Sequence, residues 1–142
     1  MISKSIRKAF SVAKSRGWNK IYVAIDIHDT ILASNYLKDT ISRSFFPGAL
    51  NTLQYLSKRK DVVLIMYTSS HPDEIWKYKQ FFEINKIHFD YENENPEVTT
   101  TEGYGCYDKK FYFNVLIEDK AGFDADQDWL LVQSTFEEFG SL

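Results

Sequence analysis

The sequence predicts a single α/β domain, residues 1–142, built on a mostly parallel sheet with helices on both faces. Residues 21–26 and 62–67 are apolar without strict alternation, which is typical of strands covered on both faces. Helical patterns separate such strands along the chain, and right-handed crossovers of this kind produce parallel neighbours. A chain of 142 residues is long enough for one domain with a substantial core.

The first element is an amphipathic helix within residues 1–18, which we expect to pack against the domain. Its apolar residues recur at helical spacing, and Gly17 is a stop signal. The opposite face carries Lys4, Arg7, Lys8, Lys14 and Arg16. This face is interpreted as a solvated surface, and a basic arm for nucleic acid or for a membrane is the alternative.

The middle of the chain alternates strands and helices. A strand at residues 21–26 is followed by a helix within residues 46–60, where Pro47 lies near the start. A second strand, residues 62–67, precedes a helix within residues 71–87, and Pro72 favours its first turn.

The last third is predicted to hold three more strands and one short helix. Residues 92–107 form an acidic, glycine-containing loop without periodicity, expected near the site. Ser134 and Glu137 have the spacing of a capping box. The expected elements are, in order, a strand at 87–91, the loop, strands at 113–119 and 128–133, and a helix at 134–140.

Composition excludes several classes of protein. A net charge of −3 and a pI near 5.6 give no nucleic-acid signature, so nucleic acid is not an expected partner. No apolar stretch approaches the roughly 20 residues that a membrane-spanning helix needs. The single cysteine, Cys106, excludes an internal disulfide and suits a reducing compartment, so we expect a cytoplasmic protein.

Polar side chains follow the strands that we expect to be neighbours. Asp26 ends the first strand, Thr68 follows the second, and Glu118 and Asp119 end a later one. Ligands of open α/β sheets bind beyond the carboxyl ends of the strands. Carboxylates suit Mg²⁺, while a hydroxyl and a nearby ammonium group suit phosphate. The sequence therefore predicts a metal and phosphate site at this edge, with Lys109 and Lys110 shortly before the last of these strands.

These stretches resemble the motifs of the haloacid dehalogenase-like (HAD) hydrolases. "YVAIDIHDTI" looks like their first motif, "VVLIMYTSS" their second, and "KKFYFNVLIEDKAGFD" their third and fourth. The resemblance covers most of the chain from residue 21 to residue 132. It implies a Rossmann-like three-layer fold and a Mg²⁺-dependent phosphatase that acts through a phospho-aspartate.

Carried over by position, the resemblance assigns a role to each of these residues. Asp26 would be the nucleophile and a metal ligand, and Thr68 would bind the phosphoryl group. Lys110 is the better match to the family's lysine, with Lys109 as the alternate. Asp119 would complete the metal site, assisted by Glu118 or, as a weaker match, Asp124. Thr30 would hold the turn after the first strand.

His28 departs from the family pattern, which has an aspartate two residues after the nucleophile. The resemblance gives that position a backbone carbonyl that binds the metal, and a side chain that transfers protons. Imidazole is able to act as acid and base near neutral pH. Alternatively, Asp29 takes the role through an altered turn, or Asp29 serves only the turn as a left-handed residue.

The spacing of the motifs leaves no room for a large cap domain, so the site should be open to a small phosphorylated molecule or to an exposed phosphoester on a larger one. Two rivals to a phosphatase follow from the same residues. One is a binding or regulatory protein that keeps the metal but lost turnover through His28. The other is an interaction module that uses the basic N-terminal helix. The physiological substrate and the oligomeric state stay open.

Overall fold

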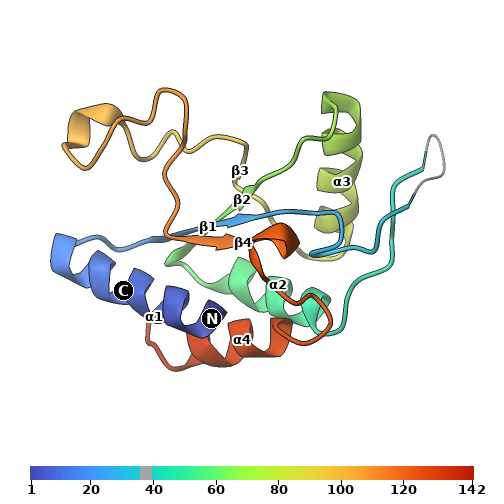
Figure 1. Cartoon of the computed structure of the whole chain (residues 1–142), viewed down its shortest axis with the longest axis horizontal. Helices are drawn as coiled ribbons and strands as arrows, with labels where there is room; N and C mark the ends of the chain where they lie inside the picture. The colour runs from blue at the N-terminus through green and yellow to red at the C-terminus, as the bar shows by residue number, and fades with distance from the viewer. Residues whose placement is uncertain (36–39) are drawn as a thin grey trace.

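Four parallel strands form the central sheet in the order β3-β2-β1-β4 (Figure 1). The computed structural model describes residues 1–35 and 40–142. The strands are β1 (Ile21–Ile25), β2 (Val62–Met66), β3 (Tyr91–Glu92) and β4 (Val115–Ile117). The helices are α1 (Ile2–Arg16), α2 (Ala49–Lys58), α3 (Pro72–Ile84) and α4 (Trp129–Glu137), with short 3₁₀ turns η1 (Thr100–Glu102) and η2 (Asp119–Ala121). The predicted fold class is confirmed, and no cap domain occurs in the part of the chain described.

Helix ends follow the predicted local signals. α1 ends at Gly17, whose φ of 69° lies in the left-handed region that glycine adopts without a steric penalty. α3 starts with Pro72, and Asp73 and Glu74 follow in its first turn, where their charges complement the helix dipole. None of the helices within residues 1–35 and 40–142 has the length and apolar character needed to cross a membrane.

Three helices cover one face of the sheet. In Figure 1, α1, α2 and α4 lie together below the strands. Alternate strand residues, such as Val23, Ile25 and Leu64, join the core formed with these helices. Buried Tyr78 and Phe82 bring α3 into the same core. Burial on both faces explains why the strands show no alternation of polar and apolar residues.

The other face is covered by an irregular segment instead of the predicted helices. Tyr22, Val63, Ile65 and Val98 form a second buried cluster there, covered by the aromatic side chains of Trp18, Tyr91, Tyr107, Phe111 and Tyr112. The chain between β3 and β4 passes over this side of the sheet (Figure 1). This segment has no helical periodicity. Its aromatic side chains bury a large apolar area and cover this face of the sheet in place of a helix.

The predicted strand at residues 128–133 is wrong, because these residues belong to α4. Trp129, Val132 and Phe136 are fully buried at spacings of three and four, whereas Leu130 and Leu131 are 69% and 46% exposed. That pattern fits one face of a helix and does not fit alternation along a strand. The predicted capping box is also wrong, since Ser134 lies inside α4 and donates a hydrogen bond to the Leu131 carbonyl.

The predicted strand at residues 87–91 is shorter and shifted, since β3 is Tyr91–Glu92. The N–H of Asp90 donates to the Leu64 carbonyl at 2.8 Å, and the Asp90 carboxylate accepts from the Leu64 N–H at 2.9 Å. The Asp90 carboxylate thus takes the place of the backbone carbonyl that would accept from Leu64 in a regular parallel pair. Regular pairing of β2 with β3 therefore starts only at Tyr91.

Candidate metal and phosphate site

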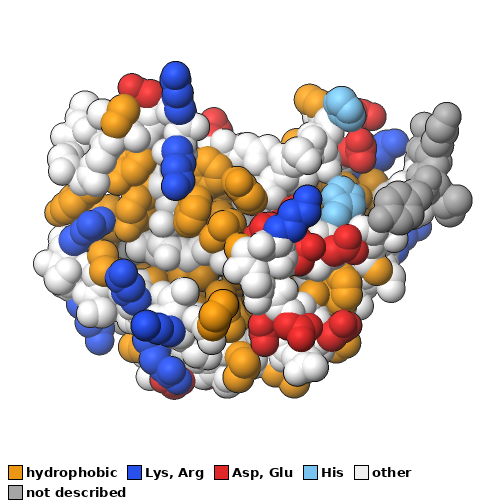
Figure 2. Space-filling model, in the orientation of Figure 1, with side chains coloured by type: hydrophobic (Ala, Val, Ile, Leu, Met, Phe, Trp, Pro, Cys, Tyr) orange, Lys and Arg blue, Asp and Glu red, His pale blue; other side chains and the backbone are white. Residues whose placement is uncertain are grey.

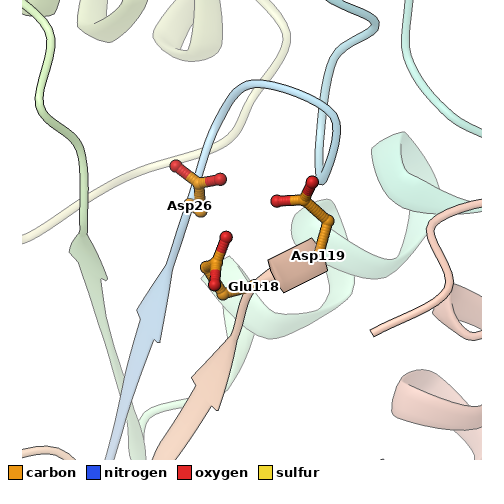
Figure 3. Close-up of side chains that lie close together, drawn as sticks. All are labelled: Asp26, Glu118 and Asp119. Atoms are coloured by element: carbon orange, nitrogen blue, oxygen red, sulfur yellow. The ribbon is translucent and has the colours of Figure 1, made fainter. Parts of the chain in front are cut away.

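Two neighbouring strands bring the predicted acids together. β1 and β4 run in parallel with Ile25 opposite Ile117, and the Asp26 N–H extends the pairing by donating to the Ile117 carbonyl at 3.0 Å. Asp26 therefore emerges beside Glu118 and Asp119. One carboxylate oxygen from each of the three lies within 4.8 Å of the others. Figure 3 shows the three carboxylates close together at the ends of β1 and β4.

The strand order makes this place a switch point of the sheet. The chain leaves β1 toward β2 on one side, and β4 joins β1 on the other. Crossovers on opposite sides open a crevice at the carboxyl ends of the strands, where α/β proteins bind ligands.

A buried hydroxyl connects the two acidic strands. Thr30 is fully buried, and its Oγ1 accepts a hydrogen bond from the Asp119 N–H at 3.1 Å. The same oxygen lies 3.4 Å from Asp26 Oδ2 and 3.4 Å from Asp119 Oδ1, so its proton can be shared between these carboxylates. The Trp129 indole N–H fixes the Thr30 carbonyl at 2.8 Å. Thr30 thus holds the turn, as predicted, and also sets the spacing of two acids.

Asp29 serves the turn after β1. Its φ of 59° is left-handed, a conformation that aspartate tolerates better than most residues. Its N–H donates to the Leu32 carbonyl, and its carboxylate accepts from the Ser34 N–H at 3.1 Å. The carboxylate is therefore engaged within the turn, which favours the interpretation of Asp29 as a turn residue.

Thr68 is held in place by Asn93, a residue that no sequence pattern singles out. Asn93 accepts from the Thr68 N–H at 2.9 Å and donates to the Thr68 carbonyl at 2.8 Å. Asn93 itself has a left-handed φ of 53°. The two-point pairing of an amide with a backbone unit fixes the position of Thr68 at the end of β2.

An open cavity of about 490 Å³ joins these residues at the carboxyl end of the sheet. Its walls come from four segments of the chain and consist of Asp26, His28, Asp29, Tyr67, Thr68, Ser69, Asn93, Glu118, Asp119 and Lys120. Acidic, histidine and basic side chains gather beside the hollow on this side of the molecule (Figure 2). The volume is in the range of small-molecule sites.

The structure does not place Lys110 or Lys109 in the cavity. Both are exposed on the irregular segment before β4, and the ring of the next residue, Phe111, lies 6.1 Å from that of Tyr67. Phe111 is therefore the residue of this segment that lies near the rim of the cavity, while the two lysines are exposed to solvent. Lys120, directly after Asp119, is the lysine that lines the cavity.

Asp124 lies outside the acidic group. It is exposed, its carboxylate accepts from the Asp126 N–H at 3.0 Å, and its own N–H donates to Asp128. Asp124 therefore ties together the loop before α4, and Glu118 is the acid that accompanies Asp119.

His28 lines the cavity and is anchored from behind. Its Nε2 lies 2.7 Å from the hydroxyl of Tyr78, and the two rings meet edge to face at 5.4 Å. Tyr78 is on α3 and is only 2% exposed. A side chain from a distant helix thus fixes the orientation of the imidazole.

Burial raises the pKa of Asp26 to about 6, and the neighbouring charges of Glu118 and Asp119 act in the same direction. Burial also raises the pKa of Glu118, with Asp119 as a further cause. No Lys or Arg forms an ion pair with these acids within residues 1–35 and 40–142. The negative charge of the three carboxylates is therefore not balanced by an ion pair, and the group is suited to a cation.

We expect the metal-free protein to lose stability as pH rises through this range. The native state holds a proton on Asp26 that the unfolded chain releases near pH 3.8, so the free energy of unfolding falls between about pH 4 and 6. After allowance for solvent screening, the Asp26 contribution is about 1–2 kcal/mol. Urea denaturation in the presence of a chelator, at pH 4.5 and at pH 7, measures this loss of stability. Asp26→Asn should reduce the difference in the free energy of unfolding between the two pH values. An equal difference in the variant would contradict the raised pKa of Asp26.

Comparisons with known proteins inform the fold. No family model matches the sequence, and no match is found among curated proteins. A solved structure, described as that of a conserved protein coded by a locus from Bacteroides thetaiotaomicron, is similar, with a TM-score of 0.64. The similarity covers 84% of this chain and 92% of that one at 21% sequence identity. At this identity the likeness shows the fold alone.

Proposed function

We propose that the protein is a Mg²⁺-dependent phosphatase of the HAD type, with Asp26 as the nucleophile. The observation that carries the proposal is the convergence of three carboxylates from two adjacent strands on a cavity that also contains a hydroxyl and an ammonium group. Such a site combines ligands for a hard cation with groups that bind a phosphoryl oxygen.

The donor set fits Mg²⁺. Asp26, Glu118 and Asp119 offer only oxygen ligands, and the resemblance to the family adds the backbone carbonyl of His28. Mg²⁺ keeps several waters and binds few carboxylates together with substrate phosphate, which suits an open cavity. The bound cation would neutralise the acids and polarise the phosphoryl group.

Each side chain of the cavity then has a distinct role in the reaction. A carboxylate oxygen of Asp26 attacks the phosphorus atom and the ester oxygen leaves, which forms an aspartyl phosphate. Water then attacks the phosphorus, the bond to Asp26 breaks, and phosphate and the free carboxylate result. The hydroxyl of Thr68, on a backbone fixed by Asn93, donates to Ser70 Oγ at 2.9 Å in this structure and would turn to a phosphoryl oxygen when substrate is bound. The ammonium group of Lys120 would donate to a phosphoryl oxygen as well. The hydroxyl bridge from Thr30 keeps Asp26 and Asp119 at a fixed distance. The open cavity admits either a small phosphorylated molecule or a protruding phosphoester.

A phosphate-release assay tests the proposal directly. With an activated aryl phosphate we expect turnover with Mg²⁺ and none with chelator. Asp119→Asn should raise the Mg²⁺ concentration that gives half-maximal rate by about 10-fold or more, since one charged ligand is lost. Asp124→Asn, which changes an exposed acid outside the group, is the matched control and should leave this concentration unchanged. Metal-independent turnover would refute the proposal.

The two candidate lysines can be separated in the same assay. We expect Lys120→Met to lower kcat/KM by about 10- to 100-fold, because a positive charge is removed from the cavity. Lys110→Met removes the same charge from the exposed segment and should change kcat/KM by less than about twofold. A larger effect at Lys110 would restore the sequence-based assignment.

His28 favours one alternative, a regulatory protein that binds metal and phosphate without turnover. Beryllofluoride with Mg²⁺ should then raise the melting temperature although no phosphate is released. An interaction module based on α1 is less favoured, because Arg7 pairs with Glu138 at 2.8 Å and the Arg16 guanidinium lies 4.1 Å from the Tyr104 ring centroid. A cytoplasmic location remains part of this proposal, since Cys106 has no second cysteine with which to pair.

A further inference from the structure

The aromatic cover of the second sheet face continues to the cavity at Tyr67. Val63 and Ile65 of β2 are buried on that face, and strand alternation directs Tyr67, which follows directly after β2, to the same side. The Tyr67 N–H donates to the Ile25 carbonyl at 2.9 Å, so the sheet fixes the backbone at this residue. Tyr67 lines the cavity and remains 42% exposed. The cavity wall therefore includes an accessible aromatic residue on a fixed backbone.

Two further rings support the ring of Tyr67. The ring centroid of Phe111 lies 6.1 Å from that of Tyr67, and the centroid of Phe113 lies 5.7 Å from that of Phe111. Both phenylalanines are half-buried. We call Tyr67, Phe111 and Phe113 the aromatic rim. Hydrophobic side chains adjoin the acidic ones on the face shown in Figure 2. A tyrosine that its neighbours already hold loses little conformational entropy when a ligand binds.

The aromatic rim adjoins the groups that would bind the phosphoryl group. Tyr67 and Thr68 are consecutive residues joined by a trans peptide, so their Cα atoms are about 3.8 Å apart. Asp26, Asp119 and Lys120 form other parts of the cavity wall. The cavity thus combines a polar region suited to phosphate and metal with an aromatic surface beside it. No cap domain occurs within residues 1–35 and 40–142, so the wall itself has to contact the rest of the substrate.

We propose that the aromatic rim is the subsite for the leaving group, and that the preferred substrates are phosphate monoesters with a flat ring close to the ester oxygen. This inference rests on the proposed function and names its substrate class. A flat ring packs against Tyr67 in an offset-stacked or edge-to-face arrangement, which adds to the burial of apolar area. A saturated ring of the same size gains from apolar burial alone.

A matched pair of esters tests the substrate class. Benzyl phosphate and cyclohexylmethyl phosphate place a six-membered ring at the same distance from the ester oxygen, and both leave as primary alcohols. We expect kcat/KM with Mg²⁺ to be about 3- to 10-fold higher for the benzyl ester, which is the gain that an aromatic pair provides. Equal values of kcat/KM in the natural protein would overturn the inference and leave the proposed function standing.

Variants of Tyr67 locate the preference. Tyr67→Leu keeps an apolar side chain without a ring and should bring the ratio of the two kcat/KM values close to one. The loss should appear as a higher KM for benzyl phosphate with kcat nearly unchanged, because the ring is bound equally in the ground state and the transition state. Tyr67→Phe keeps the ring and should keep the ratio. An unchanged ratio in Tyr67→Leu would refute the role of Tyr67.

Tyr104→Leu is the matched control. Tyr104 is 44% exposed, much like Tyr67, but its ring lies 5.3 Å from that of Trp18 and it is not part of the cavity wall. The variant should therefore keep the preference for benzyl phosphate. If Tyr104→Leu abolished the preference as completely as Tyr67→Leu, the ring of Tyr67 would not be its source and the inference would be wrong.

Binding without turnover separates the subsite from the proposed function. Calorimetry with Mg²⁺ should show benzylphosphonate binding about 3- to 10-fold more tightly than cyclohexylmethylphosphonate, with the difference lost in Tyr67→Leu. Equal affinities would overturn the subsite whether or not the protein releases phosphate. If neither ester is hydrolysed but the difference in affinity is present, the proposed function fails and the aromatic rim stands as a binding surface for a flat ring.

Discussion

Replacing Asp26 by asparagine is expected to lower kcat/KM for an aryl phosphate by at least about 1,000-fold. The amide oxygen is a poor nucleophile, and the substitution also removes a charged ligand from the acidic group formed with Glu118 and Asp119. Side-chain size and the backbone bond from the Asp26 N–H to Ile117 are retained, so a loss of folding does not explain the result. The rate of phosphate release at saturating Mg²⁺ measures the effect.

The same substitution should stabilise the protein when no metal is present. Burial and two neighbouring acids raise the pKa of Asp26 to about 6, so at neutral pH its charge opposes folding. A neutral amide removes that cost, and we expect a higher melting temperature in chelator. Lower activity combined with higher metal-free stability is the signature of a functional acid. Activity within about threefold of the natural protein would exclude Asp26 as the nucleophile.

Replacing Arg59 by alanine is expected to lower the free energy of unfolding by about 3–5 kcal/mol. The guanidinium forms two hydrogen bonds of 2.8 Å with the Asp61 carboxylate, and the two side chains are only 11% and 2% exposed. It also donates to the Tyr55 hydroxyl and to the carbonyls of Phe136, Phe139 and Gly140. Asp61 in turn accepts from the Leu142 N–H at 3.1 Å. The variant leaves a buried carboxylate without its cation and frees the end of the chain.

Urea denaturation at neutral pH measures this loss. The matched control is Arg7→Ala, which also breaks an arginine–carboxylate pair near α4, but one whose side chains are 55% and 45% exposed. Solvent screens the charges of an exposed pair, so Arg7→Ala should have a small effect. Equal losses for the two variants would show that the burial of Arg59 does not determine its contribution.

Local patterns predicted the elements that form independently of distant partners. The apolar strands ending at Asp26 and Thr68 were identified because a strand buried on both faces has no polar alternation. Gly17 and Pro72 marked helix ends through their own backbone preferences. The strand predicted at 128–133 failed because "DWLLVQ" is apolar enough for either structure, and packing of Trp129 and Val132 against the other helices favours α4.

The sequence by itself determined which side chains end the strands, and parallel pairing is enough to bring Asp26, Glu118 and Asp119 to one edge. Only the tertiary structure decided that Lys120 lines the cavity in place of Lys110, that Asn93 fixes Thr68, and that Tyr78 holds His28. The physical reason is that strand ends are ordered by backbone hydrogen bonds with a fixed register. Asn93 and Lys120 also lie at strand ends, but their roles depend on where β3 begins and on how the chain turns into η2 after β4, which the sequence patterns do not show. Tyr78 comes from α3, whose path depends on packing across the whole molecule.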